Sequence, residues 1–197
     1  MCICPGLTSS SNCVYVINFV EEAHSRGFDV VVINHRGINC ELSSPAMYAC
    51  NGTSDLKESI EFVHQKYNGI GRKLMVIGVS LGANRMTCLL GELGETDLVH
   101  AACILSAPMK LWIATEAAIT TADGFYDKEL GKNVANLYLK HEHILKNRFK
   151  DELGIDIKQT LESMDPLTLN KIDDQLTSKA WGYKDRKDYH YQAACAH

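Results

Sequence analysis

The chain has 197 residues, of which 46% are hydrophobic and 22% charged, and its formal net charge at pH 7 is −4. This composition is ordinary for one globular domain, and the weakly acidic charge argues against the basic patch that a nucleic-acid partner requires. No apolar run reaches membrane-spanning length, because the longest candidate, residues 98–119, contains His100, Lys110 and Glu116. The start of the sequence has no signal-peptide pattern. We therefore expect a cytoplasmic or membrane-associated protein, with membrane association only in a longer form.

The first half of the chain alternates strand and helix patterns. The predicted elements are a turn-rich loop at 5–11, a helix at 15–25, a buried strand at 28–34, a long loop at 35–52, a helix at 55–67, a strand at 73–79, a helix up to residue 93 and a buried strand at 99–106. Continuous β-branched runs are typical of buried parallel strands. The βαβαβ order predicts a parallel sheet with helices on both faces.

The second half differs, because from residue 110 a charged helical pattern dominates and no strand pattern returns. Helices are predicted at 127–153, 156–164 and 184–196. We interpret residues 1–109 as an α/β core and residues 110–197 as a helical cap or lid, which would gate and desolvate an apolar substrate. A plain helical extension that only packs is the alternative.

The cysteines and histidines give little sign of cross-links or metal. The eight cysteines form no C-x-x-C pair, which favours reduced thiols over a disulfide framework. Cys88 and Cys103 are expected on core faces, where a thiol behaves as a small hydrophobe. His141 and His143 stand two apart on a predicted helix and do not share a face, so no metal site is expected there.

The segment Gly78-Val79-Ser80-Leu81-Gly82 is a G-x-S-x-G sequence between a predicted strand and a predicted helix. On an α/β-hydrolase sheet this pattern is the nucleophile elbow, whose sharp turn exposes the serine hydroxyl. The flanking glycines let strand and helix approach closely, and the Leu81 amide points to where an oxyanion would form. A glycine-rich turn without chemistry is the alternative.

Three segments in this order carry a family resemblance: residues 5–11 (PGLTSSS), 34–37 (NHRG) and 78–84 (GVSLGAN). They resemble the α/β-hydrolase subfamily of yeast medium-chain fatty-acid ethyl ester synthase/esterases, plant embryogenesis-associated hydrolases and animal lipid hydrolases. Residues 48–56 (YACNGTSDL) and 176–191 (LTSKAWGYKDRKDYHY) are similar to the same family, so the likeness covers nearly the whole chain.

The resemblance implies a partial α/β-hydrolase fold and a serine hydrolase acting on carboxylic or lipid esters, such as an acylglycerol or a medium-chain acyl ester. Ser80 would be the nucleophile that forms an acyl-enzyme, and the backbone amides of Leu7 and Leu81 would form the oxyanion hole. The implied partner is a small-molecule ester or lipid, and neither a metal nor an organic cofactor is implied.

The chain departs from the family where the triad Asp and His are expected, because no residue matches either position. Asp173 and Asp174 lie in the cap segment, and His35 precedes Ser80, whereas the chain order of this fold is Ser, acid, His. His190 and His197 are expected to be exposed or tail histidines. We therefore predict that this chain is nearly inert, and a non-catalytic relative that binds acyl chains or a partner is the alternative.

The front of the chain also departs from the family, whose third strand lies between the strands predicted at 28–34 and 73–79. Only residues 1–4 precede the loop at 5–11, whereas a strand usually needs about five or six residues. We therefore expect this central strand to be lost, and we interpret the chain as a fragment of a longer hydrolase, shortened at both ends.

Overall fold

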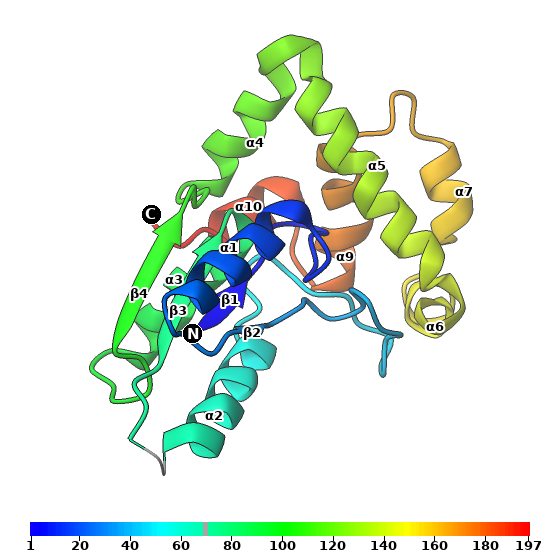
Figure 1. Cartoon of the computed structure of the whole chain (residues 1–197). Helices are drawn as coiled ribbons and strands as arrows, with labels where there is room; N and C mark the ends of the chain where they lie inside the picture. The colour runs from blue at the N-terminus through cyan, green and yellow to red at the C-terminus, as the bar shows by residue number, and fades with distance from the viewer. Residues whose placement is uncertain (69–70) are drawn as a thin grey trace. The chain divides into compact units, whose positions relative to one another are not determined.

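The computed structural model describes residues 1–68 and 71–197, and their contacts separate the chain into two compact units. The first, which we call the sheet unit, comprises Met1–Asn39 and Cys50–Met109, and the second, the helical unit, comprises Cys40–Ala49 and Lys110–His197. Figure 1 labels the elements of both units. No helix in the described residues combines the length and the apolar character that crossing a membrane requires.

The sheet unit contains four parallel strands in the order β2-β1-β3-β4. They are β1 (Cys2–Cys4), β2 (Val31–Val32), β3 (Met75–Val79) and β4 (Ala101–Leu105). The register pairs Ile3 with Val32 on one side and with Ile77 on the other. The predicted parallel sheet is therefore confirmed.

The prediction that the central strand is lost is wrong. β1 has only three residues, yet it lies between β2 and β3 and pairs with both. The ladder continues past β2, since the Ile33 N–H donates to the Ile3 carbonyl at 2.8 Å. So short a strand persists because it is paired on both sides and its three side chains are fully buried.

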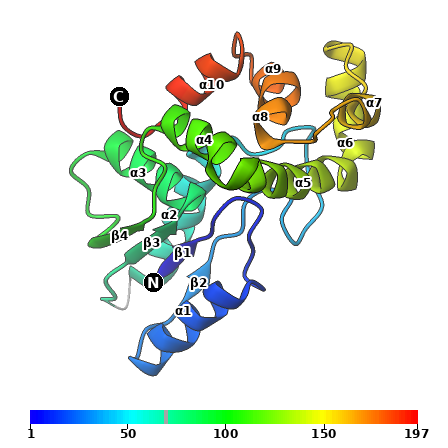
Figure 2. The ribbon, with the colours of Figure 1, turned by 90° about the horizontal axis from the view of Figure 1, so that it is seen from above.

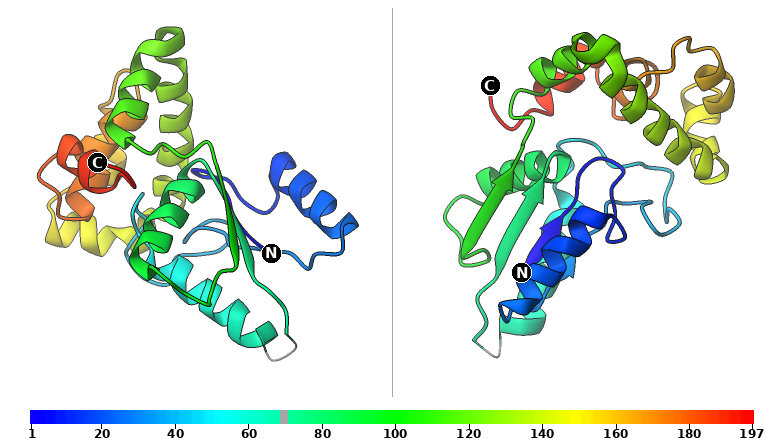
Figure 3. Two further views of the ribbon diagram at one scale, coloured as in Figure 1. Left: turned by 90° about the vertical axis from the view of Figure 1, so that its left-hand side faces the viewer. Right: turned by 45° about the horizontal axis from the view of Figure 1, so that its top comes forward.

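Helices cover both faces of the sheet, as predicted. Figure 3 (left) shows α1 (Val14–Ser25) on one side and α2 (Ser54–Asn68) and α3 (Leu81–Leu93) on the other. Successive side chains of a strand face opposite ways, so alternate residues of β1 and β3 pack toward α2 and α3. The resulting core contains Cys2, Cys4, Leu56, Ile60, Val63, Leu74, Val76, Met86 and Leu89.

The last strand, β4, was expected to be buried, and this prediction is wrong. In β4 the first four residues, 101–104, are exposed, and Cys103 lies among them rather than on a core face. The cause is position, because β4 lies at the end of the strand order and pairs with β3 along one edge. Cys88, on α3, is partly buried.

Residues 110–197 of the helical unit form helical segments of 3 to 16 residues (Figure 2). They are α4 (Leu111–Thr120), a 3₁₀ turn (Thr121–Gly124), α5 (Phe125–Lys140), α6 (Glu142–Lys146), a π-helical segment (Asn147–Glu152), α7 (Ile157–Glu162), α8 (Leu169–Ile172), a second π-helical segment (Asp173–Thr177), α9 (Ser178–Ala180) and α10 (Arg186–Gln192).

Two helix predictions in this unit need correction. The helix expected at 127–153 is divided at His141, whose φ of −105° departs from helical values. Helix α4 was not predicted, because its sequence LWIATEAAIT carries one charged residue, Glu116, and so lacks a charged helical pattern. The helices at 156–164 and 184–196 are present over shorter spans as α7 and α10.

Candidate active site

Ser80 lies at the turn between β3 and α3, at the carboxyl end of a central strand. Its φ of 53° and ψ of −117° place it in a region that residues with a Cβ rarely adopt. The turn is held on both sides, since the Ser80 N–H donates to the Leu105 carbonyl at 2.8 Å and the Ser80 carbonyl accepts from the Asn84 N–H at 3.0 Å. Ser80 is exposed, so this strained turn presents a hydroxyl at the surface of the sheet unit.

The two glycines around Ser80 permit two different close contacts. A Cβ on Gly78 would lie 2.7 Å from the Ala83 Cα, so this glycine lets the strand approach the helix. A Cβ on Gly82 would overlap the Cys4 and Pro5 carbonyl oxygens and lie 2.7 Å from the Cys4 carbonyl carbon. Gly82 therefore allows the end of β1 and the loop after it to pack directly against α3, a contact that the sequence did not predict.

The loop at residues 5–11 lies beside Ser80. A Cβ on Gly6 would stand 3.3 Å from the Ser80 Cβ. Leu7 follows Gly6 in a turn, and Leu81 is the first residue of α3, with 4% of its surface exposed. The amides of a helix's first turn have no partner inside the helix. The two residues predicted for the oxyanion hole thus belong to the two segments that meet at Ser80.

The motif at residues 34–37 holds this loop and the start of α2. The Asn34 side chain accepts from the Ser11 N–H at 2.8 Å, which fixes the far end of the loop. Arg36 donates to both carboxylate oxygens of Asp55, at 2.9 and 2.5 Å. These bonds lower the pKa of Asp55 and raise that of Arg36. In the sequence this motif was only a mark of resemblance, because its partners are distant along the chain.

His35 is buried between two partners and cannot serve as a base for Ser80. Its Nε2 lies 2.8 Å from the Pro5 carbonyl oxygen, and its Nδ1 lies 2.5 Å from Arg85 Nη1. Only 2% of its surface is exposed. Burial, reinforced by the Arg85 charge, lowers the pKa of His35 to about 3. Both ring nitrogens are therefore engaged.

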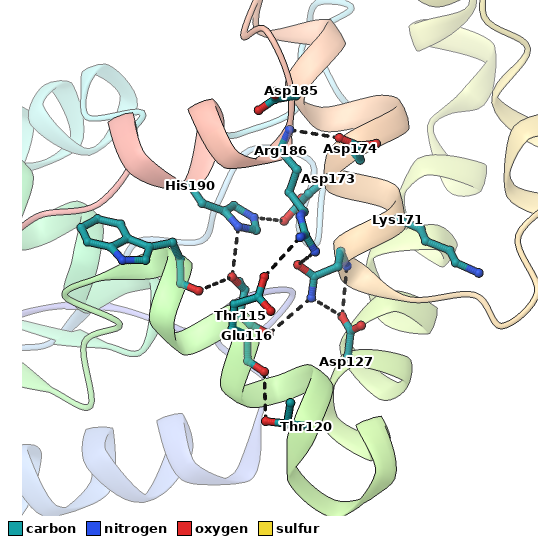
Figure 4. Close-up of polar contacts among 12 residues, drawn as sticks. Thr115, Glu116, Thr120, Asp127, Lys171, Asp173, Asp174, Asp185, Arg186 and His190 are labelled. Carbon is teal, nitrogen blue, oxygen red and sulfur yellow. Dashed lines mark hydrogen bonds and ion pairs between the residues drawn. The ribbon is translucent and has the colours of Figure 1, made fainter.

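In the helical unit, His190 was expected to be exposed, and this prediction is wrong. Figure 4 shows its ring between Asp173 and Thr115, with 2% of the residue's surface exposed. Its Nε2 lies 2.8 Å from Asp173 Oδ2, and its Nδ1 lies 3.0 Å from Thr115 Oγ1. The pairing arises because α10, which carries His190, contacts both α4 and the π-helical segment that carries Asp173. Asp174, its neighbour, is exposed and accepts from the Arg186 N–H at 3.1 Å.

A metal site would need several ligands on converging elements. Within residues 1–68 and 71–197, no group of three or more His, Cys, Asp or Glu side chains is arranged to hold a metal ion. His141 is fully buried, whereas His143 lies on the surface 3.1 Å from Glu41 Oε2. The candidate site of the sheet unit is the exposed Ser80 hydroxyl beside two backbone segments.

A sequence model of the alpha/beta hydrolase fold family matches residues 1–196. The chain is 28% identical over 208 residues to the Danio rerio protein named monoacylglycerol lipase ABHD2, and the alignment covers 100% of this chain and 46% of that relative. It is 27% identical over 194 residues to the Bos taurus protein named phospholipase ABHD3, and the alignment covers 96% of this chain and 44% of that relative. The chain thus spans about half the length of these curated relatives. No solved structure matches it significantly.

Proposed function

The chain belongs to the alpha/beta hydrolase fold family, and from this premise we propose that it is a serine hydrolase acting on carboxylic or lipid esters through Ser80. One observation carries the proposal. Ser80 occupies a strained strand-to-helix turn, and the loop carrying Leu7 lies beside it. The names of the relatives, monoacylglycerol lipase and phospholipase, support a lipid ester such as an acylglycerol as the substrate class.

In the proposed reaction the Ser80 hydroxyl attacks the ester carbonyl carbon and gives its proton to a base. The bond to the alcohol then breaks as the alcohol oxygen takes up that proton, and water hydrolyses the acyl-enzyme, which releases the acid and regenerates the Ser80 hydroxyl. The amides of Leu7 and Leu81 would donate to the oxyanion of the tetrahedral intermediate. Loss of one such donor typically lowers kcat by about 10²–10³.

This reaction needs a base, and two buried histidines, His35 and His190, already have both ring nitrogens engaged. Among the described residues of the sheet unit, no side chain forms a hydrogen bond with Ser80. His35 is engaged by Pro5 and Arg85, and in the helical unit His190 is engaged by Asp173 and Thr115. Removal of the base from a catalytic triad costs on the order of 10⁶ in rate. We therefore propose that this chain by itself turns over esters very slowly.

The same engagement of His35 and His190 favours a second candidate, a non-catalytic relative that binds acyl chains or a partner. The two candidates differ in one measurable property. A hydrolase has a Ser80 hydroxyl that reacts when a base is provided, whereas a binding protein needs no reactive serine.

Covalent labelling with a fluorophosphonate, with and without free imidazole as an external base, tests the proposal. We expect slow labelling of the purified chain, acceleration by imidazole, and a labelled peptide that contains Ser80. Ser80→Ala should abolish the slow labelling, its acceleration by imidazole and the labelled peptide. Ser106→Ala is a matched control, because Ser106 is also exposed, follows strand β4 and has a φ of 52°.

The proposal is overturned if imidazole does not accelerate labelling, or if Ser80→Ala is labelled as fast as the unaltered chain. Tight binding of a fatty acid together with an unreactive Ser80 would support the second candidate. Rapid labelling without imidazole would instead show that a base within the protein reaches Ser80.

A further inference from the structure

A buried arginine and a buried histidine connect α3 to the loop that carries Leu7. Arg85, on α3, has 3% of its surface exposed and donates from Nε to the Gly52 carbonyl at 2.7 Å. Its Nη1 lies 2.5 Å from His35 Nδ1, and the opposite ring nitrogen of His35 lies 2.8 Å from the Pro5 carbonyl oxygen. The guanidinium, the imidazole and the carbonyl therefore form one continuous series of hydrogen bonds.

The donor and acceptor rules allow one protonation state for this series. A guanidinium has no acceptor, so His35 Nδ1 must accept from Arg85 and cannot carry a hydrogen. A carbonyl has no donor, so His35 Nε2 must carry the hydrogen that it donates to Pro5. A second proton on the ring would set two donors against each other. His35 is thus a neutral imidazole of fixed tautomer, in agreement with its lowered pKa.

This imidazole controls the orientation of the loop as well as its distance. A peptide group is planar, so a hydrogen bond to the Pro5 carbonyl also constrains the Gly6 N–H. That N–H donates to the Tyr15 hydroxyl at 2.9 Å, so the Pro5–Gly6 peptide is held at both ends. The next peptide is held through its carbonyl, since Gly6 O accepts from the Ser9 N–H at 3.1 Å. In a trans peptide the Leu7 N–H then points away from Ser9.

We propose that His35 and Arg85 are positioning residues of the site: Arg85 orients a neutral His35, and His35 fixes the peptides that aim the Leu7 amide at the oxyanion. This inference rests on the proposed function. The close contact at Gly82 sets how near the loop lies to α3, whereas the hydrogen bond from His35 constrains its peptide planes. Oxyanion donors must be held to within about 0.5 Å and 10–20° to be effective.

Three variants and one control test this role. His35→Phe removes both hydrogen bonds, His35→Gln keeps an amide donor for Pro5, and Arg85→Met removes the cation and its donors while keeping an unbranched apolar side chain. The control is Ile60→Ala, which creates a cavity in the core of the sheet unit and alters none of these contacts. The functional measurement is imidazole-assisted phosphonylation of Ser80, separated into probe affinity and the rate constant at saturating probe.

We expect His35→Phe to lower the saturating rate constant about 100-fold, as for loss of an oxyanion donor, with probe affinity changed less than about threefold. His35→Gln should restore most of that loss. Ile60→Ala should lower the melting temperature and leave the rate constant unchanged. If the unaltered Ser80 is labelled and His35→Phe is labelled equally fast, the positioning role is wrong while the proposed function stands.

An unreactive Ser80 would contradict the proposed function alone, and two further measurements would still test the role of His35 and Arg85. Nitrogen-15 NMR of the imidazole should show an unprotonated Nδ1 at pH 5, and in Arg85→Met the pKa of His35 should rise because the opposing cation is gone. Amide hydrogen exchange at Leu7 and Thr8 should be faster in His35→Phe than in Ile60→Ala. Equal exchange in these two variants, or a protonated Nδ1 at pH 5, would overturn the inference.

Discussion

The two units each bury a histidine to the same degree and hold it in different ways. His35, in the sheet unit, lies between the Arg85 cation and a backbone carbonyl. His190, in the helical unit, lies between the Asp173 carboxylate and the Thr115 hydroxyl. Each residue exposes 2% of its surface, so burial alone does not distinguish them. The chemical nature of the neighbours does.

This difference separates two structural tasks. The partners of His35 permit a single arrangement of hydrogens, which suits a ring that must hold one backbone peptide in place. A hydroxyl can donate or accept, and Thr115 Oγ1 also lies 3.0 Å from the Leu111 carbonyl, to which it can donate instead. The His190 series is therefore adaptable, and it joins α4, the π-helical segment and α10 through side chains alone.

The largest effect should come from breaking the backbone contact on which the sheet unit depends. Gly82→Ala puts a Cβ 2.7 Å from the Cys4 carbonyl carbon, in the buried central strand, so β1 and α3 cannot keep their spacing. We expect a loss of about 3 kcal/mol in the free energy of unfolding, measured by denaturation followed by circular dichroism. Gly91→Ala, on the same helix with open space around it, should instead gain about 0.5–1 kcal/mol. Equal stability in the two variants would refute the contact.

A smaller effect is expected on the helical side of the comparison. Asp173→Ala leaves the buried His190 Nε2–H without its acceptor, which should cost about 1–3 kcal/mol. Asp174→Ala, at the exposed neighbouring position, should cost less than about 1 kcal/mol. Both tryptophans, Trp112 and Trp181, belong to the helical unit, so their fluorescence during denaturation reports on it. Similar losses in both variants would mean that the buried pair does not stabilise this unit.

Local pattern predicted those features that depend on neighbours in sequence. The alternating pattern identified the parallel strands and the helices α1, α2 and α3, and G-x-S-x-G between a strand and a helix placed Ser80 at the turn. The signal for each element lies within about twenty consecutive residues. The backbone of the candidate site could therefore be predicted from the sequence.

Features that depend on distant partners could not be predicted. His35 contacts Pro5, 30 positions before it, and Arg85, 50 positions after it, and no local sequence pattern predicts such contacts. The burial of His190 depends on Thr115, which is 75 positions away. The exposure of β4 follows from its place at the edge of the sheet, whereas its apolar sequence resembles that of an inner strand. The three-residue β1 is stable because of its two neighbours.

The smallest predicted effect is a pH dependence that distinguishes the neutral His35 from an ordinary histidine. The unfolded chain binds a proton at His35 near pH 6.5, whereas the folded chain does so only near pH 3, because burial and Arg85 lower the folded pKa. Between these values the unfolded state holds more protons, so stability is fully present above pH 6.5 and falls as the pH falls. From pH 7 to pH 5.5 this amounts to about 1 kcal/mol. His35→Gln, which has no titrating group, should lose this part of the slope, so the difference between the two slopes isolates His35. Parallel slopes would show that His35 titrates normally and that Arg85 does not hold it neutral.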